Sequence, residues 1–179
     1  MKTLILLLFG LLNAVYSPIS PNCSCDWEGP FIEMAKESDL VARIKVLDHQ
    51  EMMEIYEDSI PNAMIVEVLE VYRGTEQCKE VKIWGDNGFL CRPYLSIFPI
   101  GSEWILSLQK GEQSIEGEAE DDYSISICGE SGLHVVDGQV KGVIFPGNVD
   151  KQEDGITYET QEISLSKLKE EIESSTSDL

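Results

Sequence analysis

The cysteines are the residues of this sequence whose type and spacing could do the most chemistry. Cys23 and Cys25 stand one residue apart near the start of the chain, and Cys78, Cys91 and Cys128 follow. Cysteine sulfur forms disulfides, binds metals or acts as a nucleophile, and the redox compartment decides which of these prevails. Because the count of five is odd, one thiol remains if the others form disulfides.

The first residues of the chain predict the compartment. Lys2 precedes an apolar run over residues 4–12, and small residues follow up to Ser17, which is typical of a secretory signal peptide over residues 1–17. A retained amphipathic anchor is the alternative. The two prolines of residues 18–22 predict an extended spacer. No second apolar run has the length of a membrane span. We therefore expect a secreted or periplasmic protein, in which disulfides are favoured.

The charge of the chain narrows the class of partner. The formal net charge is −20, with 33 acidic and 13 basic residues. Such a surface repels nucleic acids and anionic membranes, so we expect neither as a partner. Cationic proteins and divalent cations are compatible with it. Residues 111–122 are nearly all acidic or small and predict a mobile acidic loop; a calcium site is the alternative, although EF-hand spacing is absent.

No grouping of residues predicts catalysis. His49 and His134 belong to no metal-ligand spacing, and we expect them on the surface or in loops. A glycine-rich phosphate loop is absent, and Gly129-Glu130-Ser131-Gly132 falls short of the Gly-x-Ser-x-Gly nucleophile turn. We therefore predict no catalytic residue, no cofactor and no enzyme activity.

The elements that must position the cysteines are mostly short strands. Alternating apolar residues, rich in Val and Ile, predict strands at 40–47, 63–72, 81–84, 103–108 and 123–128, and a hairpin of 133–136 with 139–144. We expect a loop over residues 48–62 and, because Glu67 and Glu70 interrupt the alternation, a bulge within 63–72. Trp104 shares a strand face with Leu106 and Leu108 and is expected in the core.

Helices are expected only near the two ends. Phe31, Met34 and Ala35 share one face of a predicted helix over residues 30–36, with Pro30 at its first position. A terminal helix over about 163–173, capped by Ser164, should dock on the barrel through Leu165, Leu168 and Ile172. The predicted fold class is therefore all-β with peripheral helices, in the form of a small antiparallel barrel.

Five short motifs follow one another along the chain. They are Cys23-Ser24-Cys25, Ala42-Arg43-Ile44-Lys45-Val46, Val71-Tyr72-Arg73-Gly74, Gly88-Phe89-Leu90-Cys91 and Ile125-Ser126-Ile127-Cys128. In this order they resemble the netrin-like domain of the tissue inhibitors of metalloproteinases. The resemblance covers residues 23–145 and leaves 146–179 as an acidic C-terminal extension. It implies a five-stranded OB-type barrel, with Cys23 paired to Cys91, Cys25 paired to Cys128 and Cys78 as the free thiol.

The resemblance also implies a function. In those inhibitors the free amine and carbonyl of the first cysteine bind a protease's catalytic zinc, and the next side chain enters the adjoining pocket. Cys23 and Ser24 would take these roles in an inhibitory edge formed by Cys23, Ser24 and Cys25, with no intrinsic metal. Chelation requires cleavage after Asn22, whereas Val15 and Ser17 suit cleavage better. The alternative is a non-inhibitory extracellular interaction module in which the Cys-x-Cys motif is only a structural staple.

Overall fold

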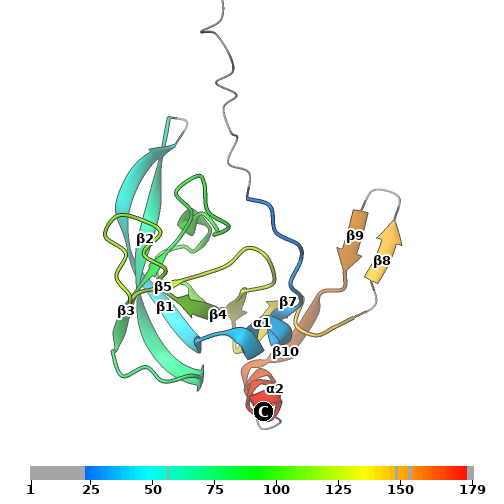
Figure 1. Cartoon of the computed structure of the whole chain (residues 1–179). Coiled ribbons are helices and arrows are strands. Elements are labelled where there is room, and N and C mark those ends of the chain that lie inside the picture. The colour runs from blue at the N-terminus through cyan, green and yellow to red at the C-terminus, as the bar shows by residue number, and fades with distance from the viewer. Residues whose placement is uncertain (1–22, 56, 148, 153–154, 177–179) are drawn as a thin grey trace, which may run out of the picture.

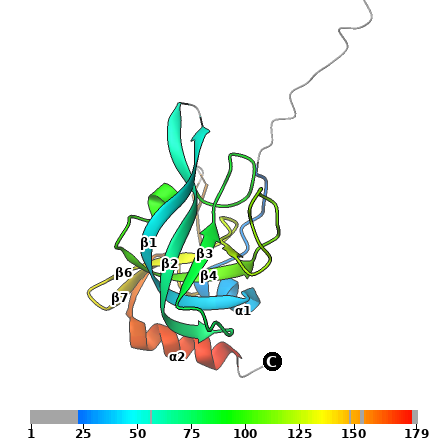
Figure 2. The same ribbon diagram turned by 90° about the vertical axis from the view of Figure 1, so that its left-hand side faces the viewer.

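A five-stranded barrel forms the centre of the computed structural model, which describes residues 23–55, 57–147, 149–152 and 155–176 (Figures 1 and 2). The strands follow the order β1-β2-β3-β5-β4, and β4 pairs back onto β1, which closes the barrel. β3 and β5 pair in parallel, and the other neighbours are antiparallel. The predicted OB-type barrel is confirmed. Its strands are β1 (Leu40–Ile55), β2 (Asp58–Arg73), β3 (Glu80–Trp84), β4 (Glu103–Lys110) and β5 (Tyr123–Ser124).

Alternation along β1 fills the barrel, as predicted. Leu40, Ala42, Ile44 and Val46 are fully buried in one apolar cluster, to which β4 contributes Leu106 and Leu108. Successive side chains of a strand point to opposite faces, so every second residue of β1 from Leu40 to Val46 enters the interior. Trp104 packs against this cluster from a half-buried position.

The predicted loop over residues 48–62 is wrong, because β1 and β2 continue through most of it as a two-stranded ribbon. Gln50 pairs with Ala63, and Ile55 pairs with Asp58. The outer part of the ribbon pairs only with itself and faces little core, so its sequence lacks the alternation of a half-buried strand. The bulge predicted in 63–72 is confirmed, because the register skips Leu69 and Tyr72.

The sheet continues beyond the barrel on one side. β6 (Gly132–Val136) pairs with β4, β7 (Gln139–Gly142) with β6, and β10 (Gln161–Ser164) with β7. The predicted hairpin is confirmed, and its turn uses Asp137 and Gly138, both with positive φ. Only Tyr123–Ser124 of the strand predicted over 123–128 is in a strand. β8 (Val149–Gln152) and β9 (Gly155–Tyr158) form a separate hairpin.

Two α-helices lie against the barrel, and η1 (Leu95–Ile97) is a short 3-10 turn. α1 (Phe31–Glu37) is preceded by Pro30, which is its N-cap rather than its first residue. α2 (Leu165–Thr176) begins two residues later than predicted, because β10 takes up Ile163 and Ser164 in pairing with β7. The predicted cap is confirmed, since the Lys167 N–H donates to Ser164 Oγ at 3.3 Å.

A second apolar cluster joins the C-terminal segment to the rest of the protein. Leu168 and Ile172 of α2 are fully buried there with Phe31 of α1 and with Ile105 and Leu133 of the sheet. The segment predicted as an extension over 146–179 therefore shares a core with the barrel, and the predicted docking of its helix is confirmed.

The predicted signal peptide, residues 1–17, and spacer, residues 18–22, lie outside the described residues. Among the residues that the structure does describe, neither helix has the length and apolar character needed to cross a membrane.

Candidate functional site

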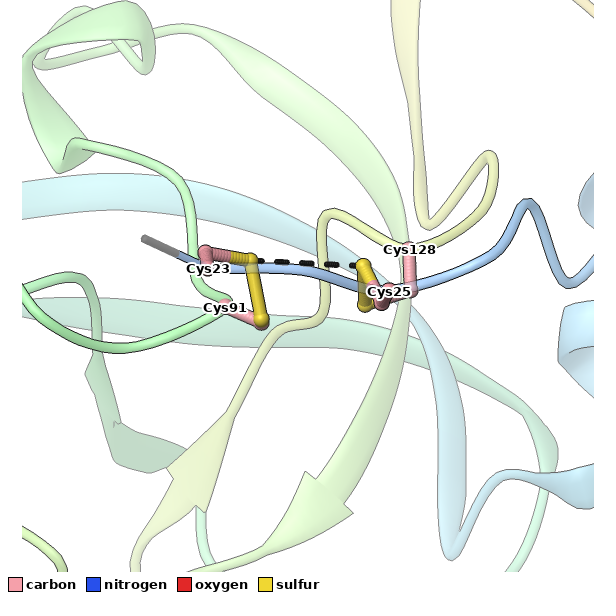
Figure 3. Close-up of side chains that lie close together, drawn as sticks. All are labelled: Cys23, Cys25, Cys91 and Cys128. Atoms are coloured by element: carbon pink, nitrogen blue, oxygen red, sulfur yellow. Dashed lines mark hydrogen bonds between the residues drawn. A yellow bond between two sulfur atoms is a disulfide. The ribbon is translucent and has the colours of Figure 1, made fainter. Parts of the chain in front are cut away.

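Two disulfides tie the N-terminal segment to the barrel (Figure 3). Cys23 is bonded to Cys91 and Cys25 to Cys128, the pairing that the resemblance implied. Cys91 lies between β3 and η1, and Cys128 lies between β5 and β6. Two loops far apart in the sequence are therefore fastened to one short segment.

Backbone hydrogen bonds hold the same three segments together. The Glu28 N–H donates to the Cys128 carbonyl at 2.7 Å, and the Glu130 N–H donates to the Gly29 carbonyl at 3.0 Å. The two loops also bond to each other, because the Ile127 N–H donates to the Cys91 carbonyl at 3.1 Å. The segment that carries Cys23 and Cys25 is therefore fixed by covalent links and by its backbone.

The spacing of the Cys-x-Cys motif explains why both of its side chains reach the loops of the barrel. In an extended chain, side chains two residues apart point to the same side, so Cys23 and Cys25 can both reach the loops. Their Sγ atoms lie 4.0 Å apart, a contact between two disulfides that carry no thiol proton (Figure 3). Ser24 between them is exposed. Cys23, Ser24 and Cys25 form what we call the N-terminal edge.

Exposed apolar side chains stand on the loops that hold this edge, and the sequence reasoning did not single them out. Phe89, two residues before Cys91, is 63% exposed, and Ile127, next to Cys128, is 46% exposed. Figures 1 and 2 place the tip of the β1–β2 ribbon at the same end of the molecule as the start of the described chain. The sequence does carry a signal for Phe89, because it directly follows Gly85-Asp86-Asn87-Gly88, a composition typical of a turn, and belongs to no alternating apolar run.

The acidic residues 111–122 form a loop that is ordered by two inward-facing carboxylates. Glu118 is buried and forms an ion pair with buried Arg92. The Trp84 indole N–H donates to Asp122 Oδ2 at 2.7 Å. Within the described residues, the loop brings no group of three carboxylates together as ligands for an ion. The geometry therefore does not support the calcium alternative.

Cys78 is free and exposed and lines a cavity of about 650 Å³ with Glu76, Lys110 and Asp121. The backbone N–H of Cys78 donates to Glu76 Oε1 at 2.7 Å. The Glu76 carboxylate raises the pKa of the Cys78 thiol by hydrogen bonding and by its charge. A raised pKa keeps the sulfur protonated, so it is a poor nucleophile.

The two histidines make separate structural contacts and do not share a site. His49 Nε2 lies 2.9 Å from the Phe98 carbonyl oxygen. His134 stacks on Trp104 with ring centroids 4.7 Å apart. Both lie on strands, β1 and β6, so the loop part of that prediction is wrong, although His134 is exposed as expected. Among the described residues, neither takes part in a cluster that could bind a metal.

Comparisons with known proteins give no relative from which a function could be transferred. No protein-family model matches the chain, and no curated protein sequence matches it. The site itself therefore carries the information on function. Its N-terminal edge is exposed at Ser24 and is held by two disulfides.

Proposed function

We propose that this protein is an exported, netrin-like inhibitor that binds a zinc metalloprotease through the N-terminal edge. One observation supports the proposal above the others. The two cysteines that flank Ser24 are bonded to the barrel, while Ser24 itself is exposed. A segment that is ordered before binding loses little conformational entropy when it enters a protease cleft, and affinity rises accordingly.

The chemistry of the edge suits a catalytic zinc ion, which keeps an open coordination position for water or substrate. In a chain that begins at Cys23, the α-amine and the carbonyl oxygen of Cys23 can chelate the ion, because a catalytic zinc can expand from four to five ligands. An α-amine has a pKa of about 7.7–8.0, so a useful fraction is neutral and able to bind zinc near pH 7. Ser24 then points toward the adjoining substrate pocket.

The surroundings of the edge add contact area and charge. Phe89 and Ile127 supply exposed apolar surface on the two loops that hold it, and buried aromatic anchors dominate the binding energy of many interfaces. The net charge of −20 favours a partner with a basic rim, since complementary charge speeds association.

The mature N-terminus tests the proposal directly. Intact-mass analysis of the secreted protein should show a chain that begins at Cys23. A chain that begins at Pro18 or earlier would exclude zinc chelation, because the nitrogen of Cys23 would then be an amide.

Inhibition assays give the second test. The folded chain that begins at Cys23 should inhibit at least one zinc endopeptidase, and the same chain with one alanine added before Cys23 should lose at least about 100-fold in affinity, or about 2.7 kcal/mol. The added residue leaves the disulfides in place, converts the Cys23 nitrogen into an amide and moves the free α-amine away from it. Equal inhibition by the two chains would contradict the chelation mechanism.

A second candidate function is a non-inhibitory extracellular interaction module in which the Cys-x-Cys motif is only a staple. The exposure of Phe89 and Ile127 favours it, because these side chains can bind a partner whatever the state of the N-terminus. In that case the added alanine would leave partner binding unchanged. The double variant Phe89→Ser and Ile127→Ser would abolish it.

A further inference from the structure

The four half-cystines of the N-terminal edge and its loops also form a candidate metal site. We propose that, when both disulfides are reduced, Cys23, Cys25, Cys91 and Cys128 bind one Zn²⁺ ion. Their Sγ atoms all lie within 4.8 Å of one another (Figure 3). Over the described part of the chain, this is the one group of three or more Cys, His, Asp and Glu side chains with ligand atoms so close together. The inference does not rest on the proposed inhibition of a protease.

The sulfurs of different disulfides lie close to the spacing of a tetrahedral site. Zinc–sulfur bonds of about 2.3 Å in a tetrahedron place the sulfurs about 3.8 Å apart. The sulfurs of Cys23 and Cys25, which belong to different disulfides, are already 4.0 Å apart. Once the disulfides open, the bonded sulfurs separate, and rotation of side chains on a nearly fixed backbone brings the longer contacts to that distance.

Contacts other than the disulfides bring the three segments together. The backbone bonds from Glu28 to Cys128 and from Ile127 to Cys91 do not involve sulfur. The N-terminal segment is also anchored at Phe31, whose side chain is fully buried and whose N–H donates to the Val143 carbonyl at 2.8 Å. These contacts remain when the disulfides are reduced, and they favour the approach of the four thiols.

Conversion of the two disulfides into a zinc site requires a reductant. Each disulfide accepts two electrons and two protons from a dithiol reductant, which is itself oxidised to a disulfide. Four thiols result, and Zn²⁺ displaces their protons as it binds, because the thiolate is the ligand. Tetrahedral sulfur ligation selects zinc or iron, and zinc binds such sites more tightly than Fe²⁺.

The surplus cysteine provides a matched control. Cys78 is exposed and lies outside the four-sulfur group. If the four grouped sulfurs bind zinc, then removal of the Cys78 thiol should leave zinc binding unchanged. Nonspecific binding of zinc to thiols would involve all five cysteines and would weaken when Cys78 is removed.

Metal titration of the reduced protein tests the site. The protein is reduced with a dithiol and moved without oxygen into buffer free of reductant, and Co²⁺ is added as a spectroscopic probe. We expect one equivalent of Co²⁺ to give tetrahedral thiolate absorption and one equivalent of Zn²⁺ to displace it. Cys78→Ser should bind equally, and Cys25→Ser should weaken zinc binding by more than about tenfold. Failure of the reduced protein to bind Co²⁺, or equal binding by Cys25→Ser, would overturn the proposal.

Alkylation gives a readout that needs no variant. With zinc bound, iodoacetamide at an alkaline pH that ionises the Cys78 thiol should modify Cys78 and spare the other four cysteines. Removal of zinc with a chelator should expose all five. If the reduced protein loses its near-ultraviolet dichroism, Zn²⁺ should restore it. Modification of all five thiols in the presence of zinc, or no return of the dichroism, would contradict the assignment.

Discussion

The Arg92 guanidinium lies 2.9 Å from the Glu118 carboxylate, and the two side chains are 6% and 0% exposed. The other oxygen of Glu118 accepts hydrogen bonds from the Ser114 and Ile115 N–H groups at 2.9 and 3.2 Å. Because Arg92 directly follows Cys91, this ion pair attaches the acidic loop to the same loop that holds the N-terminal edge.

Removing the charge of Glu118 should destabilise the protein strongly. In Glu118→Gln the buried Arg92 charge has no counter-ion, which typically costs about 3–5 kcal/mol. Urea unfolding measures the loss. The control is Glu116→Gln, an exposed position in the same loop, which should change the free energy of unfolding by less than about 0.5 kcal/mol. Equal effects of the two substitutions would show that the ion pair contributes no more than surface charge.

The prediction of a mobile acidic loop over residues 111–122 rests on composition alone, and composition does not show which carboxylates are buried. A run of acidic residues looks alike in sequence whether its carboxylates face water or face a buried cation. The partner of Glu118 is Arg92, beyond β4, and nothing local connects the two. Only the folded chain shows which of the acidic residues is buried.

Loss of the disulfide between Cys25 and Cys128 should cost several kcal/mol. Their separation of 103 residues corresponds to about 4.7 kcal/mol of loop-closure entropy in the chain-entropy model. The double variant Cys25→Ala and Cys128→Ala avoids a new free thiol, and thermal unfolding measures the loss. The control Cys78→Ala removes the exposed thiol and should be neutral. A double variant as stable as the wild type would mean that the bridge does not constrain the unfolded chain.

The barrel could be predicted because its strands carry strong local patterns. Leu40, Ala42, Ile44 and Val46 alternate in β1. The hairpin of β6 and β7 beside the barrel could be predicted too, because Asp137-Gly138 specifies a tight turn. The β1–β2 ribbon and the strand β10 could not be predicted, because their pairing depends on neighbouring strands and not on a buried face of their own. The disulfide pairing followed only from the resemblance, since five cysteines alone allow several pairings.

The C-terminal helix should be essential to stability. Leu168 of α2 is fully buried between the sheet and α1, so Leu168→Ala should cost about 2–5 kcal/mol. Chemical unfolding measures it. Lys167→Ala, one residue earlier and more than half exposed, is the control and should cost less than about 0.5 kcal/mol. A neutral Leu168→Ala would mean that α2 does not share a core with the barrel, and would contradict the predicted docking of the helix.

The hydrogen bond between the Tyr123 hydroxyl and Glu76 Oε2, 2.7 Å long, should make stability depend on pH. Burial opposes ionisation of Glu76, but hydrogen bonds from the Cys78 N–H, Tyr123 and the Gln77 N–H outweigh it and lower the pKa of the carboxyl group. A lowered pKa in the folded state contributes stability above the unfolded pKa of about 4.3, and that contribution is lost as the pH falls through the folded pKa.

Tyr123→Phe should therefore destabilise the protein more at pH 7 than at low pH. The expected loss at pH 7 is about 1.5 kcal/mol, the lower end of the range for a hydrogen bond to a charged group, because the carboxylate is partly solvated. The loss should shrink once Glu76 is protonated. The carboxyl resonance of Glu76 in NMR should also titrate at a higher pH than in the wild type. Tyr94→Phe, at an exposed tyrosine, is the control. A loss that is the same at both pH values would assign the effect to packing of the ring, because only a bond to the carboxylate changes as Glu76 ionises.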